Sequence, residues 1–348
     1  MLKILLFPFA LLYDLVTAVR NYLYDTGKRN SVKFEANVIS VGNLTVGGTG
    51  KTPHVEYLIR LLKGTYKVAT LSRGYGRKSK GFIIADKMSN ASIIGDEPYQ
   101  YYNKFGNEII VTVGEDRVIA IPSLLMERPE TEVILLDDAY QHRGVRPLLN
   151  ILLSDYNRPF YEDCLMPAGR LRESRKGANR ADIVVVTKCP QDISKEKEER
   201  IAISINKFTK KSTPIFYSSI SYGTPLAVFN KNYTYENKKV LLFTGLANPM
   251  PFEEYIKQKF EVSEHLAFKD HYFYKLDDIL GIIEKFNIHN VNDDHILMTT
   301  EKDMVKLLQE DIKNNLLELP IFYIPIEVYL LKDKKEFDDL IITKGVIY

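Results

Sequence analysis

The sequence has little cysteine, almost no net charge and no long apolar run. Its two cysteines, Cys164 and Cys189, are isolated, which excludes a thiolate zinc site and a disulfide framework and favours a reducing cytoplasm. The 47 Lys and Arg nearly balance the 45 Asp and Glu, so the net charge of +2 gives no argument for nucleic-acid binding. A chain of 348 residues with 45% apolar and 26% charged types is instead typical of a globular protein of about two domains.

The N-terminal segment, residues 1–24, is apolar but does not have the length of a membrane span. Its unbroken apolar run, Ile4 to Tyr13, ends at Asp14, whereas a span needs about 20 apolar residues. No small-residue cleavage site of a signal peptide follows it. Apolar residues recur at helical spacing and basic residues lie beside them: Leu5, Phe9, Leu12, Leu15 and Val16, with Lys3, Arg20, Lys28 and Arg29. The pattern predicts a helix that either lies in a membrane interface or packs on the protein's own core.

Short β-branched runs alternate with helical stretches along the rest of the chain. Strands are predicted at 37–41, 67–71, 108–113, 132–136, 150–153 and 182–187, and helices at 54–62 and 191–211. A second α/β set starts at 239–244 and continues at 252–259, 296–299 and 321–324. This alternation predicts βαβ units and an α/β fold with a mainly parallel sheet. Residues 214–232 predict a β-hairpin between two domains. The predicted organisation is a helix at 1–24, a domain at 25–213, a linker at 214–238 and a second, smaller α/β lobe at 239–348.

Residues 45–52 contain a glycine-rich, phosphate-binding pattern between a predicted strand and a predicted helix. In the usual P-loop, Gly-x-x-x-x-Gly-Lys-Ser/Thr, a glycine stands where this chain has Thr45. Backbone N–H groups of such a loop and the helix N-terminus attract phosphate. Lys51 is predicted to contact the β- and γ-phosphates, and Thr52 to ligate Mg²⁺. The residues predicted to bind the nucleotide are Thr45, Val46, Gly47, Gly48, Thr49, Gly50, Lys51 and Thr52.

Asp137 and Asp138 supply a second nucleotide signal at the end of the predicted strand 132–136. P-loop proteins use an acid in this place to hold Mg²⁺, so both are candidate metal ligands. Lys188 follows the predicted strand 182–187 and either packs on a nucleotide base or simply ends the strand.

Seven motifs in order resemble those of the tetraacyldisaccharide 4′-kinases, the lipid A 4′-kinases. They are residues 41–53, 72–77, 95–98, 137–142, 167–173, 270–271 and 300–303, and they span nearly the whole chain. The family also has Thr at the first P-loop position. This chain departs from the family pattern at Ala139 and Tyr140, at Arg170 and at Tyr272.

The resemblance implies an ATP- and Mg²⁺-dependent kinase of two α/β/α lobes joined by a β-stranded linker. Members transfer the γ-phosphate of ATP to the 4′-hydroxyl of a tetraacylated glucosamine disaccharide 1-phosphate, giving lipid IVA, a precursor of lipopolysaccharide. They lie peripherally on the cytoplasmic face of the bacterial inner membrane, held by an N-terminal helix, which favours the interfacial interpretation of residues 1–24. No nucleic acid and no obligate protein partner are expected.

The resemblance also implies roles for single residues. Asp96 matches the catalytic base, and His271 matches the histidine that pairs with it from the second lobe. Substrate binding is predicted for residues in the matching motifs and for arginines suited to a sugar phosphate: Asn43, Arg73, Tyr75, Arg117, Arg170 and Arg172. For Arg170 and Arg172 a solvated surface arginine is an equal alternative. Residues 301–303 are predicted only to begin a helix, with acids that favour its dipole.

Two other classes of protein share part of this pattern. A nucleotide-dependent switch or metal-insertion chaperone would have the P-loop and the acidic strand end, but its Cys or His metal motif is absent from the sequence. A soluble small-molecule kinase would have no use for the apolar segment 1–24. Phosphorylation of the lipid distinguishes all three.

Overall fold

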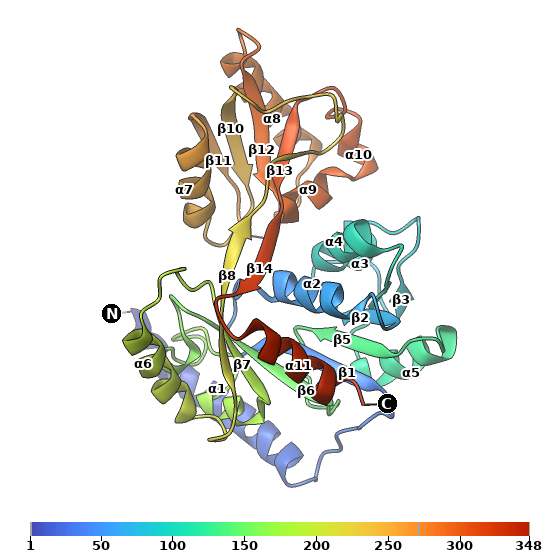
Figure 1. Cartoon of the computed structure of the whole chain (residues 1–348), viewed down its shortest axis with the longest axis vertical. Helices are drawn as coiled ribbons and strands as arrows, with labels where there is room; N and C mark the ends of the chain where they lie inside the picture. The colour runs from blue at the N-terminus through green and yellow to red at the C-terminus, as the bar shows by residue number, and fades with distance from the viewer. Residues whose placement is uncertain (1, 271, 348) are drawn as a thin grey trace.

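The computed structural model describes residues 2–270 and 272–347 and contains two β-sheets (Figure 1). Within these residues the larger sheet has nine strands in the order β14-β8-β7-β6-β1-β5-β2-β4-β3, and the smaller has five in the order β11-β10-β12-β13-β9. The strands are β1 (Asn37–Asn43), β2 (Val68–Ser72), β3 (Ile83–Ile84), β4 (Ile110–Val113), β5 (Val133–Asp137), β6 (Leu149–Asp155), β7 (Ile183–Thr187), β8 (Ile215–Tyr222), β9 (Leu226–Ala227), β10 (Lys239–Thr244), β11 (Val262–Ala267), β12 (His295–Thr300), β13 (Ile321–Ile324) and β14 (Ile326–Leu330).

The helices lie between these strands in the chain and cover both faces of the larger sheet. They are α1 (Leu2–Asp25), α2 (Lys51–Leu62), α3 (Ala91–Ile94), α4 (Asp96–Phe105), α5 (Arg117–Glu127), α6 (Lys195–Asn206), α7 (Met250–Lys259), α8 (Leu276–His289), α9 (Glu301–Leu307), α10 (Glu310–Lys313) and α11 (Lys334–Gly345), with 3₁₀ helices at Phe160–Glu162 and Arg175–Arg180. Ile39 of β1 packs in the same core as α2 and α11, whereas its neighbour Val38 packs in the core that contains α5. Successive strand residues point to opposite faces, so both are buried and the strand is apolar throughout.

The predicted mainly parallel α/β architecture is confirmed. β1 pairs in parallel with β5 and β6, and β10 pairs in parallel with β11 and β12. Antiparallel pairing occurs at the sheet edges, between β3 and β4, between β14 and β8, and between β9 and β13. In a parallel sheet the carboxyl ends of the strands meet at one edge, which is where β1 and β5 present their following loops.

The predicted hairpin at 214–232 is wrong. β8 pairs antiparallel with β14, about a hundred residues later, and β9 instead pairs with β13 of the smaller sheet. The link between the two parts of the molecule is therefore two strands that run side by side, β8 leaving the larger sheet and β14 returning to it (Figure 1). Alternating polarity predicts a half-exposed strand but does not identify its partner.

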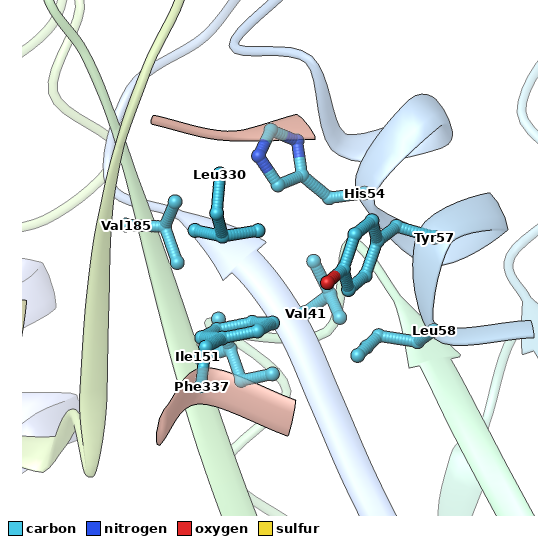
Figure 2. A pocket seen from close by; sticks show the side chains of 8 residues that line it. All are labelled: Val41, His54, Tyr57, Leu58, Ile151, Val185, Leu330 and Phe337. Atoms are coloured by element: carbon cyan, nitrogen blue, oxygen red, sulfur yellow. The ribbon is translucent and has the colours of Figure 1, made fainter. Parts of the chain in front are cut away.

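The C-terminal part of the chain also departs from the prediction of a second lobe at 239–348. β14 is an edge strand of the larger sheet, and α11 packs on that sheet through Phe337 and Ile341. Leu330 and Phe337 line a small apolar pocket together with His54 and Tyr57 of α2 (Figure 2). The returning segment therefore anchors the helix that follows the P-loop.

The N-terminal helix α1 has an exposed apolar face. Leu5 is 70% and Phe9 61% exposed, and further exposed apolar side chains are Phe7, Leu11, Leu12, Leu15, Val16, Val19 and Tyr22. The helix docks through its other side, where Tyr13 Oη donates to Arg172 O at 2.8 Å and Asn21 Nδ2 to Glu173 Oε2 at 2.8 Å. Packing on the protein's own core thus accounts for only part of the helix surface. Among the described residues, no helix has both the length and the apolar character needed to cross a membrane.

Candidate functional site

The P-loop connects β1 to α2, as predicted. Gly47 and Gly50 have φ angles of 103° and 83°, a left-handed conformation that favours glycine and turns the chain into the helix that begins at Lys51. The loop is held against the 170–172 segment, because Val46 N donates to Arg170 O and Arg172 N donates to Leu44 O, both at 2.8 Å. Two motifs that are far apart in the sequence therefore form one rigid frame for phosphate.

Lys51 and Thr52 contact acids from other elements. Lys51 Nζ lies 3.8 Å from Asp138 Oδ1, directly after β5. The Thr52 hydroxyl donates to Glu97 Oε1 of α4 at 3.2 Å. The first turn of α2 is thus in contact with both the acidic strand end and the motif that contains Asp96.

Asp137 is buried, and its surroundings suit a divalent cation. Tyr101 Oη donates to its Oδ2 at 3.1 Å, whereas its Oδ1 has no hydrogen-bond partner among the described residues. Burial and the nearby Glu97 and Asp138 raise the pKa of Asp137 to about 7, although Lys51 opposes this. A buried carboxylate oxygen without a donor, close to a hydroxyl and a second carboxylate, is a donor set that Mg²⁺ accepts. No three His, Cys, Asp or Glu side chains of the described residues are grouped to hold a metal by themselves.

Asp138 is fixed by Arg172. The guanidinium donates to both carboxylate oxygens, at 3.1 and 2.8 Å, and also to Asn43 Oδ1 at 2.5 Å and Thr45 O at 3.1 Å. Burial opposes ionisation of Asp138, but Lys51 and Arg172 together lower its pKa below the usual value. A two-pronged pair of this kind holds a carboxylate in one orientation. Asn43 and Arg172, predicted to bind substrate, here hold the acid and the P-loop.

The other predicted substrate residues fall into two groups. Arg117 is buried and donates to the carbonyls of Gly114 and Glu115, at 3.2 and 3.1 Å. Burial lowers its pKa to about 10, against the attraction of Asp137 and Asp138. Arg73, Tyr75 and Arg170, by contrast, are exposed.

Asp96 is the first residue of α4, and its side chain is only 13% exposed. Its Oδ2 lies 3.8 Å from Nζ of Lys306, which comes from α9 in the second lobe. The predicted partner, His271, lies outside the described residues. The neighbouring Asp270 accepts from Lys302 Nζ at 3.1 Å, so Asp270 lies near α9.

Lys188 contacts the P-loop. Its ammonium donates to Gly48 O, and to Asp155 Oδ2 at 2.8 Å. The preceding Thr187 Oγ1 donates to Thr49 O at 2.9 Å. Beyond ending the strand, this pair therefore fixes the loop from the β7 side.

Sequence reasoning missed Glu97 and Lys306. Glu97 lies in the same 95–98 motif as Asp96, and a second acid in the first turn of the helix was the available signal. Lys306 is three residues beyond the 300–303 motif, on a helix predicted to have no chemical role. Its burial and its distance to Asp96 depend on long-range packing and had no signal in the sequence.

His54 lies buried on α2 below the P-loop, and its ring joins the loop to β8. Nδ1 contacts Gly50 O at 2.6 Å and Nε2 contacts Ser218 Oγ at 2.9 Å. The neutral ring with a proton on Nδ1 satisfies the carbonyl and accepts from the Ser218 hydroxyl. Burial, and to a smaller extent the charge of Lys188, lowers the pKa of His54 from 6.5 to about 4 although the bond to Gly50 opposes this.

We expect His54 to make the folded protein acid-sensitive. The unfolded chain takes up a proton on this ring near pH 6.5 and the folded chain only near pH 4, so stability falls as the pH decreases between these values. The loss from this residue is roughly 3 kcal/mol. His54→Asn keeps an amide that can donate to Gly50 but does not titrate, and its stability should depend less on pH. Urea unfolding at several pH values checks this; equal pH dependence of the two proteins would contradict it.

Comparisons with known proteins agree with this geometry. A family model for tetraacyldisaccharide-1-P 4′-kinases matches residues 2–345. The chain is 44% identical over 341 residues to the tetraacyldisaccharide 4′-kinase of Flavobacterium johnsoniae, covering 97% of this chain and 96% of that protein. It is 43% identical over 347 residues to the enzyme of the same name from Cytophaga hutchinsonii, with 99% and 96% covered.

A solved structure is similar over the same extent. LpxK from Aquifex aeolicus, crystallised in complex with ATP, has a TM-score of 0.77 to this structure and is 31% identical, with 100% of each chain covered. Because the family model and these relatives span nearly the whole chain, the chain belongs to the tetraacyldisaccharide-1-P 4′-kinase family.

Proposed function

We propose that this chain transfers the γ-phosphate of ATP to the 4′-hydroxyl of a tetraacylated glucosamine disaccharide 1-phosphate, giving lipid IVA for lipid A biosynthesis. The observation that carries the proposal is the contact of Lys51 with Asp138 at 3.8 Å, which joins the P-loop to the acidic strand end in a chain of this family. The ATP complex of the Aquifex relative supports ATP as the donor.

Phosphoryl transfer requires positioning and charge neutralisation more than covalent chemistry. Backbone N–H groups of the glycines Gly47, Gly48 and Gly50 and the N-terminus of α2 bind the phosphates, and Lys51 stabilises charge on the γ-phosphoryl. Thr52, Asp137 and Asp138 would hold Mg²⁺, which would supply positive charge to neutralise the phosphates. Arg172 fixes Asp138 for this purpose through both carboxylate oxygens.

The acceptor lipid meets a separate set of residues in this proposal. Asp96 accepts the proton of the 4′-hydroxyl, with His271 orienting the carboxylate. Arg73, Tyr75 and Arg170 are exposed and contact the sugar phosphate, for which a guanidinium is suited. We assign Asn43, Arg117 and Arg172 to holding the P-loop and the acidic strand end, because Arg117 also donates to Asp137 O at 3.4 Å and Arg172 donates to both Asn43 and Asp138.

The exposed face of α1 would place the enzyme peripherally on the cytoplasmic face of the bacterial inner membrane. Nine exposed apolar side chains on one helix, from Leu5 to Tyr22, suit the boundary between headgroups and acyl chains. The acylated substrate lies in the same membrane, so enzyme and lipid would encounter each other by diffusion along the membrane surface. Neither nucleic acid nor a second protein is required.

We expect glutamate at Leu5, Phe9 and Leu12 to release the protein from vesicles of phosphatidylethanolamine and phosphatidylglycerol. Each apolar side chain contributes about 1.5–3 kcal/mol when it is fully buried, so the triple change removes most of the interfacial binding. The KM for lipid should rise while the affinity for ATP stays unchanged. The same substitution at Met126, Met250 and Val291, which are exposed on other elements, is the matched control. Vesicle flotation measures the membrane binding of the α1 variant and of the control. If the α1 variant still binds the vesicles fully, the membrane anchor lies elsewhere in the protein.

The function is tested by incubating the full chain with labelled ATP and disaccharide 1-phosphate lipid in mixed micelles, followed by chromatography and mass spectrometry of the lipid. The proposal requires label at the 4′ position and its loss in Lys51→Ala. A nucleotide switch or chaperone would hydrolyse ATP without labelling lipid. A small-molecule kinase would label a water-soluble sugar equally well when the acyl chains are removed.

A further inference from the structure

Lys306 of α9 is fully buried where the second lobe packs against α4. Its side chain is 0% exposed, although it carries a charge. Nζ donates to Asp303 Oδ1 at 2.9 Å and lies 3.8 Å from Asp96 Oδ2. Burying an ammonium group is unfavourable unless acids compensate it, and here the two acids come from different lobes.

Asp303 holds Lys306 in a fixed place. Its Oδ2 accepts from Gly245 N at 2.8 Å and from Thr300 Oγ1 at 2.7 Å, which directs Oδ1 to the lysine. The loop after β10 comes so close that a Cβ at Gly245 would lie 2.8 Å from Asp303 Oδ1. The ring of Tyr274, 5.9 Å from Nζ, covers another side of the ammonium. The lysine is thus built into the second lobe and presented to the first.

A second lysine joins the same two helices without approaching Asp96. Lys104 of α4 donates to Glu301 of α9 at 2.7 Å and to Glu56 of α2 at 2.8 Å. Helices α4 and α9 pack against each other along this contact. Lys104 therefore also links α4 to α9, but its ammonium pairs with Glu301 and Glu56, whereas that of Lys306 faces Asp96.

We propose that Lys306 is a positioning residue for phosphoryl transfer, which orients the Asp96 carboxylate from the opposite lobe. The inference rests on the proposed function of Asp96 as the base. Because Lys306 is rigid within the second lobe, the base is correctly aimed only while α9 is packed on α4. Docking of the lobes and assembly of the base are then one event.

The test compares Lys306→Met in two backgrounds. Methionine removes the charge and keeps most of the volume, so kcat should fall on the order of 10²-fold while the KM for ATP is unchanged. In the Asp96→Asn background the same change should cost little more, because a residue that acts through Asp96 has nothing left to orient. An equal loss in both backgrounds would overturn the inference. If Asp96→Asn alone keeps full activity, it is the proposed base that fails.

Two further variants separate positioning from folding. Lys306→Met leaves Asp303 buried without its cation, so the pair Asp303→Asn with Lys306→Met, neutral at both places, is measured alongside and should show the same loss of kcat when folded. Lys104→Met breaks a contact between the same helices and should lower the melting temperature with kcat within about 3-fold of wild type. A loss of kcat in Lys104→Met as large as in Lys306→Met would mean that lobe contact alone matters, and the role of Lys306 would be rejected.

Discussion

Lys51→Ala should abolish nearly all lipid phosphorylation by a folded protein. We expect kcat to fall roughly 10²- to 10³-fold, the effect of removing one preorganised donor from a transition state, with a smaller rise in the KM for ATP. The physical reason is that Lys51 lies at the start of α2, 3.8 Å from Asp138, and in the proposed mechanism its charge stabilises the γ-phosphoryl. Asp138 keeps its two bonds to Arg172, so the fold should survive the change.

Lys63→Ala is the matched control for Lys51→Ala. Lys63 directly follows α2 and pairs with Glu108, away from the P-loop. Turnover of the control should be close to wild type, and the melting temperatures of both variants should lie near that of the parent. Near-normal phosphorylation by folded Lys51→Ala would remove the P-loop from the proposed mechanism.

The P-loop and the acidic strand end were predictable because each is continuous in the sequence. A buried strand, glycines and a following helix lie within residues 37–62, and Asp137 ends a strand whose apolar run is visible. The seven motifs in order then gave the family and the α/β fold, both of which the comparisons confirm. The assigned roles of the site residues remain predictions.

What the sequence did not predict depends on contacts between distant segments. The sequence does not show that β8 pairs with β14 or that α11 packs on the larger sheet, because a local pattern of alternating polarity is equally compatible with a hairpin. Arg172 was predicted to bind a phosphate of the substrate, but the fold places it against Asp138. Arg172 comes after β6 in the chain and Asp138 comes after β5, and these two strands lie on opposite sides of β1. Lys306 had no signal in the sequence, because its burial depends on the packing of α9 in the folded protein.

Asp96→Asn should reduce kcat by 10²- to 10⁴-fold, the usual contribution of a general base, with little change in ATP affinity. Asparagine keeps the shape of the side chain at the start of α4 but cannot take the proton of the sugar hydroxyl. Asp277→Asn is the matched control, since Asp277 is an exposed acid in the first turn of α8. It should leave kcat at the wild-type value, whereas a folded and fully active Asp96→Asn would mean that another group accepts the proton.

His271→Ala completes the test of the proposed base. If His271 orients Asp96 rather than accepting the proton itself, its removal should lower kcat less than Asp96→Asn does. Residues that act as one unit are not additive, so the double variant should lose about as much as the more damaged single variant. Rates of all three at saturating Mg²⁺, ATP and lipid decide this. Fully multiplicative losses would show two independent groups. The Asp96 carboxylate would then depend for its orientation on Lys306, whose Nζ lies 3.8 Å from Oδ2 and which His271→Ala does not change.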